Sequence, residues 1–126
     1  MPVNDFAKGV IKNMYKAEYD ENNVLCSASH YTQKYYLGER FSNLPDKVKK
    51  ELQVMCVLFT ERVGGVLVVY FDKTGEVKLS TEAYEEDIMY DPIESELQVR
   101  QLLDEKEELF EELANYYRMF FLSMNE

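Results

Sequence analysis

Residues 91–123, DPIESELQVRQLLDEKEELFEELANYYRMFFLS, decide the fold because they predict one long amphipathic helix that closes the chain. Asp91 suits the N-cap and Pro92 the first helical position, and Glu94 follows three residues after the cap, as in a capping box. Apolar residues then recur at steps of three and four, with Lys106 in the one polar slot. They are Val99, Leu103, Phe110, Leu113, Tyr117, Phe120 and Met124. This apolar stripe must be buried against another part of the chain or against another molecule.

The expected helix is long for a chain of 126 residues. About 32 residues at 1.5 Å each make a rod of about 48 Å, whereas a compact chain of this length is only about 36 Å across. One end should therefore overhang, bend, or pack on another molecule. The stripe also keeps a seven-residue period, which predicts self-association, for example as a homodimer, through Val99, Leu103, Phe110 and Tyr117. The simpler interpretation, which is compatible with the first, is that the stripe covers the chain's own sheet.

Composition indicates one folded domain over residues 1–126, because 46% of the residues are hydrophobic and 13% aromatic. No apolar run is long enough to span a bilayer, and no signal peptide is recognisable. Cys26 and Cys56 lie in apolar surroundings and are expected to be buried thiols, although a disulfide between them stays open. We therefore expect a cytoplasmic protein with no membrane partner.

Charge is distributed unevenly along the chain. Residues 1–75 carry 10 Lys and Arg against 9 Asp and Glu, whereas residues 76–126 carry 4 against 15. The second part therefore holds essentially all of the net charge of −10. Such a field repels nucleic acid and anionic lipid, and it favours basic proteins or cations.

The remaining elements follow from periodicity and turn residues. Helices are predicted over 3–17 and from an Asn43 cap to a stop at Gly64. Strands are predicted over 24–31 and 33–41, and a hairpin over 65–85 turns at residues 72–75. The order is α-β-β-α-β-β-α. The expected fold class is α+β, an antiparallel sheet packed by helices on one or both faces and closed by the long C-terminal helix.

Few residues offer catalytic chemistry. The predicted strand places His30 on the face of Cys26, but the two side chains would be about 13 Å apart. The acidic spacing does not match a helix-loop-helix calcium loop, and Glu105, Glu108 and Glu112 have no neighbouring histidine to complete a dinuclear metal site. We therefore predict no catalytic residue, no metal ligand and no cofactor, and a protein that is not an enzyme.

The acidic connector before the closing helix is the predicted partner surface. Its residues are Glu82, Glu85, Glu86, Asp87 and Tyr90. A second set is rich in tyrosine, a residue common in recognition surfaces and in half-buried positions: Tyr31, Tyr35, Tyr36, Tyr84, Tyr90, Tyr116 and Tyr117. A small-ligand or enzymatic pocket formed by His30 and these tyrosines is the alternative hypothesis.

Two segments carry a resemblance. CSASHYTQKYYL at 26–37 and GGVLVVYFDKTGEVKLSTEAYEEDIMYDPIESELQVRQLL at 64–103 resemble a family of small, uncharacterised, acidic cytosolic proteins from Gram-positive anaerobes. That resemblance implies no activity. The element order and the hairpin FDKTGEVKLSTEAYEED at 71–87 look like the YezG-type immunity proteins, which neutralise secreted toxins. The long closing helix and the lack of tryptophan depart from that second pattern, so it is an architectural analogy.

The leading functional hypothesis is therefore a non-enzymatic protein-interaction domain. Its acidic surface would bind a protein partner, for example a basic protein in an immunity-like role, and no nucleic acid.

Overall fold

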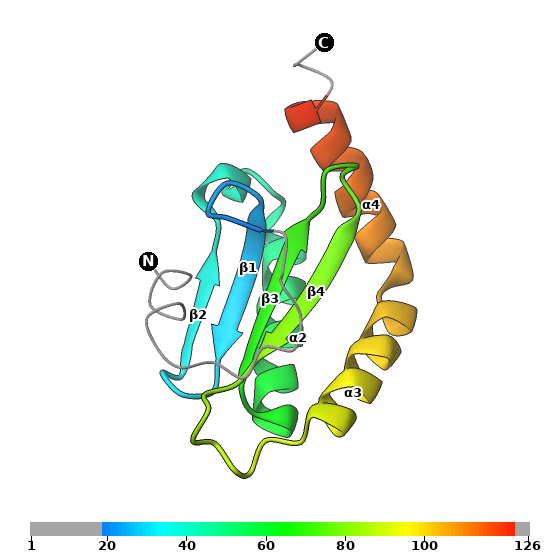
Figure 1. Ribbon diagram of the computed structural model, residues 1–126. Helices are drawn as coiled ribbons and strands as arrows, with labels where there is room; N and C mark the ends of the chain where they lie inside the picture. The colour runs from blue at the N-terminus through cyan, green and yellow to red at the C-terminus, as the bar shows by residue number, and fades with distance from the viewer. Residues whose placement is uncertain (1–18, 123–126) are drawn as a thin grey trace.

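The computed structural model describes residues 19–122 and shows an α+β fold (Figure 1). Its strands form an antiparallel sheet in the order β2-β1-β3-β4: β1 (Val24–Ser29), β2 (Lys34–Leu37), β3 (Val66–Phe71) and β4 (Val77–Glu82). Its helices are α2 (Asp46–Val63), α3 (Pro92–Glu105), α4 (Glu107–Tyr117), a 3₁₀ turn η1 (Glu39–Phe41) and a π-helical turn η2 (Arg118–Leu122). The predicted fold class is confirmed. The helix predicted over 3–17 lies outside the described residues.

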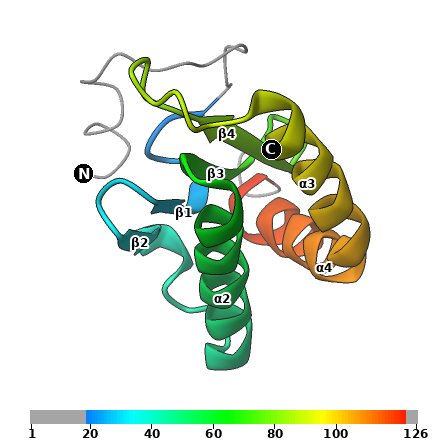
Figure 2. The same cartoon turned by 90° about the horizontal axis from the view of Figure 1, so that it is seen from below.

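The helices all lie on one side of the sheet (Figure 2): α2 and α4 pack on its face, and α3 packs against α2 and α4. Side chains alternate across a strand, so one face of the sheet meets these helices and the other does not. The helix-facing side chains join the main core, in which Leu25, Leu67 and Phe71 are fully buried. The opposite face carries a smaller cluster of Val24, Val66, Val68 and partly buried tyrosines.

The inner strands β1 and β3 are buried on both sides. Each of the six residues of β1 is buried, and in β3 all but Tyr70 are. The strand β3 is therefore covered on both of its faces. The pairing of β1 with β3 skips one residue between Val24 and Cys26, which is a β-bulge. The bulge turns Leu25 and Cys26 toward the same helix-facing core.

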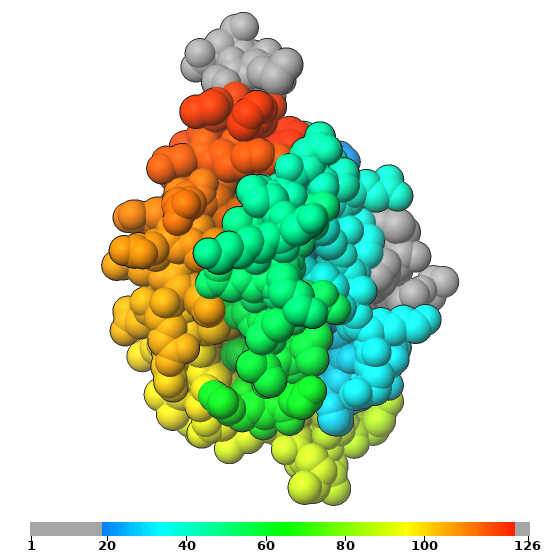
Figure 3. Space-filling model, turned by 180° about the vertical axis from the view of Figure 1, so that it is seen from behind, coloured from blue at the N-terminus to red at the C-terminus, as the bar shows by residue number. Residues whose placement is uncertain are grey.

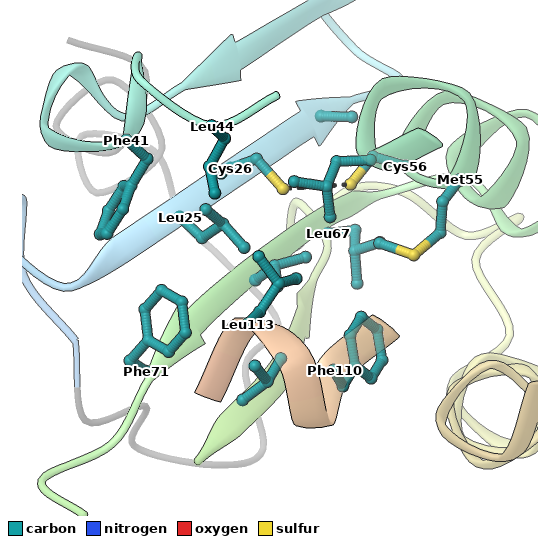
Figure 4. Close-up of a cluster of buried hydrophobic side chains, with 14 of the residues drawn as sticks. Leu25, Cys26, Phe41, Leu44, Met55, Cys56, Leu67, Phe71, Phe110 and Leu113 are labelled. Atoms are coloured by element: carbon teal, nitrogen blue, oxygen red, sulfur yellow. Dashed lines mark hydrogen bonds between the residues drawn. The ribbon is translucent and has the colours of Figure 1, made fainter. Parts of the chain in front are cut away.

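The main core joins the sheet to α2 and α4 (Figure 4), and Val99 and Leu102 of α3 are partly buried against it. Leu52 and Met55 of α2 and Leu113 of α4 pack in it. At one end, the Phe71 and Tyr117 rings stack with centroids 4.1 Å apart, and Phe41 packs on Phe71 at 5.5 Å. These aromatic contacts hold the end of the last helix against β3.

Helix α2 begins later than the sequence predicts. Its N-cap is Pro45, with no side-chain cap, so the prediction of Asn43 as the cap is wrong. An intervening proline fixes φ near −65° and has no N–H to donate, and here it occupies the cap position. The predicted end is confirmed, because Gly64 closes α2 and its N–H donates to the Thr60 carbonyl.

The closing segment is two helices, so the prediction of one continuous rod is wrong. Asp91 caps α3 as predicted, since its side chain accepts hydrogen bonds from the Ile93 and Glu94 N–H groups. The break falls at Lys106, whose backbone lies at φ −108° and ψ 20°. Lys106 is the one polar residue in the apolar stripe, and its Nζ pairs with Glu51 of α2 at 3.1 Å. Of the three outcomes expected for a helix longer than the domain, an overhang, a bend or packing on another molecule, the structure shows the bend.

Candidate functional site

Two of the predicted partner-surface residues are buried. Glu82 lies at the end of β4, and its Oε1 accepts a hydrogen bond from the Tyr19 hydroxyl at 2.8 Å. Burial, with the nearby Glu82 carboxylate, raises the pKa of Tyr19. The Tyr90 hydroxyl is also buried and donates to Ser95 Oγ at 2.7 Å. Glu82 and Tyr90 therefore hold the ends of the acidic connector in place.

The connector itself, residues 83–91, is anchored through Asp87. Its Oδ2 accepts from the Tyr31 hydroxyl at 2.5 Å, and its Oδ1 accepts from the Met89 N–H at 3.1 Å. The Tyr31 hydroxyl in turn accepts from the Tyr84 N–H at 3.2 Å, and the Tyr31 and Tyr84 rings stack with centroids 4.0 Å apart. Desolvation and the Asp87 hydrogen bond raise the pKa of Tyr31. The β4–α3 loop is thus tied to the sheet by one tyrosine.

This anchored loop presents apolar side chains to water. Ile88 and Met89 are each 87% exposed, and they are followed on α3 by Ile93 at 74% and Leu97 at 54%. Ile93 and Leu97 are four residues apart and so lie on one helix face. We call Ile88, Met89, Ile93 and Leu97 the loop patch. The loop protrudes at the lower edge of the molecule in Figure 3.

Acidic side chains surround the loop patch. Glu85 and Glu86 are exposed directly before it. Residues 82–99 hold seven Asp and Glu and no Lys or Arg. An apolar patch with a single-sign rim attracts partners of the opposite charge.

The four residues predicted for self-association lie in different environments. Phe110 and Tyr117 are buried in the core, and Val99 is partly buried against it. Leu103 is 38% exposed. Self-association stays a prediction, and Leu103 is the member of the set that a second chain would reach most readily.

A groove runs between α2 and the closing helices, along the crease between green and yellow-orange surfaces in Figure 3. The part between α2 and α3 encloses about 570 Å³, and the part beside α4 about 510 Å³. Both parts are lined by Lys47, Glu51, Glu105 and Lys106. The Glu51–Lys106 ion pair stands where they meet.

His30 and the cysteines do not form a site together. The strand β1 ends at Ser29, so the prediction of a strand that includes His30 is wrong. His30 is exposed in the following turn, where its N–H is bound by the Gly65 carbonyl at 2.8 Å, and its ring meets Tyr31 edge-on. It lines neither part of the groove.

The two cysteines are buried free thiols, with Sγ atoms 3.6 Å apart (Figure 4). The hydrogen bond with Cys26 and burial raise the pKa of Cys56. A thiol held in its protonated form is a poor nucleophile and a poor metal ligand. Within residues 19–122, no three His, Cys, Asp or Glu side chains converge where they would hold a metal ion.

Reasoning from the sequence missed two surface features, which are the loop patch and the α2 side of the groove. The apolar dipeptide Ile88–Met89 stands alone between acids, a pattern typical of an exposed anchor, and it was visible in the sequence. In α2, Lys50, Val54, Leu58 and Arg62 recur every four residues, but only the packing of α3 shows that this row borders a groove.

Comparison with known proteins identifies a family but no activity. None of the described helices is both long and apolar enough to cross a bilayer. No curated protein and no solved structure matches the chain significantly. One family model, described as a family of unknown function (DUF6145), matches residues 22–125. The match agrees with the resemblance to a small uncharacterised family, whereas the anaerobe origin and the YezG-type analogy stay predictions. With 22–125 spanning the sheet and all the described helices, the chain belongs to the DUF6145 family.

Proposed function

We propose that the chain is a non-enzymatic, cytoplasmic protein-interaction domain whose β4–α3 loop inserts into an apolar cleft with a basic rim on a partner protein. The carrying observation is the pair Ile88 and Met89, each 87% exposed on a loop whose backbone is hydrogen-bonded to Asp87. Large apolar side chains fully in water are unfavourable, and those held in place are typical recognition anchors.

The loop is suited to binding because it is already ordered in the free chain, so binding costs little conformational entropy. Complete burial of an Ile or Met side chain contributes about 1.5–3 kcal/mol. Ordering a free loop would offset much of that gain. Here Tyr31 and Asp87 already fix the loop, so the burial of Ile88 and Met89 is retained as affinity.

The acids beside the anchors select the partner. Glu85 and Glu86 are exposed and have no basic residue near them in the sequence. Such rim charges act mainly on the rate of association and on the exclusion of acidic competitors. A basic partner therefore fits best, and an immunity-like role against a basic toxin is one form of this proposal.

The test is quantitative affinity capture from the source cell, followed by titration calorimetry with the purified partner. We expect Ile88→Ser with Met89→Ser to weaken the interaction by at least about tenfold, as hot-spot truncations do. Glu85→Ser with Glu86→Ser should mainly lower the association rate and its dependence on salt.

Met119→Ser is the matched control, because Met119 is equally apolar and 63% exposed but lies near the other end of the closing segment. It should leave capture unchanged. Equal capture of the same proteins by the wild-type chain and the Ile88/Met89 variant would remove the loop from the interaction.

A further inference from the structure

The α2 side of the groove is a polar-apolar-polar row. Val54 and Leu58, one helical turn apart, are 44% and 54% exposed although they line a concave surface. Lys50 stands one turn before Val54, and Arg62 one turn after Leu58. Beneath the row, Met55 and Phe59 form a buried floor, and Leu102 of α3 forms the opposite wall. An apolar centre with a cation at each end is thus open to solvent.

The groove differs in charge from the rest of the molecule. The chain carries a net charge of −10, but the α2–α3 part of the groove is lined by four cationic and two acidic side chains. Glu51 is neutralised by Lys106. Lys47 and Lys50 form no ion pair within residues 19–122, and Arg62 reaches only the Gln98 amide oxygen, at 3.5 Å. With that pair set aside, three cations on the α2 rim stand against one acid, Glu105 of α3, so the net charge of the groove is positive and sits on the α2 rim.

We infer that the groove between α2 and α3 binds an acidic amphipathic helix from a partner protein. Two apolar anchors of that helix, three or four residues apart, would cover Val54 and Leu58. Carboxylates one turn outside the anchors would pair with Lys50 and Arg62. This is the helix-in-groove mode of recognition, and charge complementarity selects an acidic rather than a basic helix.

The dimensions of the row agree with such an occupant. Residues 50 and 62 are twelve positions apart, which corresponds to about 18 Å along a helix. A bound helix of about twelve to fourteen residues spans this distance. The inference extends the proposed interaction role to a second surface, and it does not depend on the β4–α3 loop.

A second copy of the chain is the competing occupant. Its loop also combines acids, Glu85 and Glu86, with exposed apolar residues, Ile88 and Met89. The loop itself is not helical, but Ile93 and Leu97 of the loop patch lie one turn apart on α3 beside Glu94 and Glu96, so a second copy also offers apolar anchors on an acidic helix. The test therefore includes a measurement that separates the two occupants.

The probe is a fluorescein-labelled, fourteen-residue amphipathic peptide with leucines at helical spacing and glutamates elsewhere. Its matched control carries lysine in place of every glutamate. Fluorescence anisotropy near physiological salt should show that the glutamate peptide binds at least about tenfold more tightly. Leu58→Ser should weaken that binding by about tenfold, and Lys50→Glu with Arg62→Glu should reverse the preference between the two peptides.

Ile88→Ser with Met89→Ser separates this inference from the proposed loop contact. That variant should bind the glutamate peptide as tightly as the wild type does, but it should no longer capture the cellular partner. Because Leu58 is half exposed, Leu58→Ser should fold, and an unchanged circular dichroism spectrum with unchanged capture of the loop partner verifies this.

Equal or tighter binding of the lysine peptide would overturn the inference, as would a Leu58→Ser variant that binds normally. Self-association of the free chain in light scattering, abolished by Leu58→Ser, would instead assign the groove to a second copy and would also overturn the inference.

Discussion

Gly65 is the residue at which the hairpin and the closing helices meet. Its φ is +68°, a conformation that L side chains rarely adopt. A Cβ atom there would lie 2.5 Å from the Glu82 carbonyl oxygen and 2.8 Å from Cε1 of Tyr90. Tyr90 in turn donates to Ser95 in the first turn of α3. The absence of a side chain at position 65 therefore allows Tyr90 to fix where α3 begins.

We predict that Gly65→Ala lowers the free energy of unfolding by about 2 kcal/mol or more, from backbone strain and the close approach together. Urea denaturation measures this. Gly65→Asn is the informative companion, because asparagine tolerates positive φ but also carries a Cβ. It should regain only the part of the loss that comes from backbone strain, and recovery to near wild-type stability would show that the close approach is unimportant.

The acidic residues near the β4–α3 loop show that residue type alone does not predict which side chains are exposed to a partner. Glu82, Glu85 and Glu86 are the same residue type within five positions, yet Glu82 is buried against Tyr19 and the other two are exposed. Glu82 is the last residue of β4, where side chains alternate between faces. Whether a glutamate is buried or exposed here therefore depends on which face of β4 its side chain occupies and on whether another residue, such as Tyr19, covers that face.

At the scale of elements, the start of α3 is the clearest local prediction. Asp91 Oδ1 accepts from the Ile93 N–H at 3.0 Å and the Glu94 N–H at 3.2 Å, and Pro92 occupies the first turn. These contacts satisfy donors that a helix otherwise leaves to water.

Asp91→Ala should therefore cost about 1 kcal/mol, with faster amide exchange confined to the first turn of α3. Hydrogen exchange followed by NMR detects the local opening, and thermal denaturation the global loss. Asp91→Asn keeps a cap oxygen and should lose only a few tenths of a kcal/mol. Equal losses in the two variants would contradict a capping role.

The bend at Lys106 has two contributions. A rod of about 48 Å exceeds the width expected of this domain, so the closing segment can follow the core only by bending. The bend falls where the apolar stripe holds a lysine, whose ammonium reaches Glu51 at 3.1 Å. With α3 beside α2 and α4 packed on the sheet, the bend also opens the groove that both helices line.

At the scale of the whole molecule, the buried hydroxyl and thiol groups predict sensitivity to alkali. Burial raises the pKa of Tyr19, Tyr31 and Tyr35 from the ordinary value of 10.0, and the contact with Cys26 raises that of Cys56 from 9.0. Above pH 9 the unfolded chain releases these protons and the native chain retains them. The unfolded state is thereby favoured, and stability falls as pH rises.

We expect the free energy of unfolding in urea to be level near neutral pH and to fall progressively from about pH 9 upward. Tyr35→Phe is the matched variant, because the Tyr35 hydroxyl is buried beside the Cys26 thiol and forms no well-aligned hydrogen bond among the described residues. It should be at least as stable as the wild type at pH 7 and should lose less stability at high pH. A flat profile to pH 11 would show that these groups titrate alike in both states.

Much of the fold was predictable because its causes are local. The β3–β4 hairpin, the Gly75 turn at φ +90°, the Asp91 cap and the Gly64 stop all follow from residues within a few positions. The errors at Asn43 and His30 are errors of boundary. A proline set the start of α2, and a turn set the end of β1, each a few residues from where the sequence pattern placed it.

The sequence by itself therefore determined the element types, the antiparallel sheet, the acidic second half and the presence of an apolar closing segment. Only the tertiary structure decided that this segment bends at Lys106, that Glu82 and Tyr90 are buried, and that a basic groove lies between α2 and α3. The physical reason is that periodicity and turn preference depend on neighbours along the chain. Burial, and hence which side chains a partner can reach, depends on segments that folding brings together from distant positions.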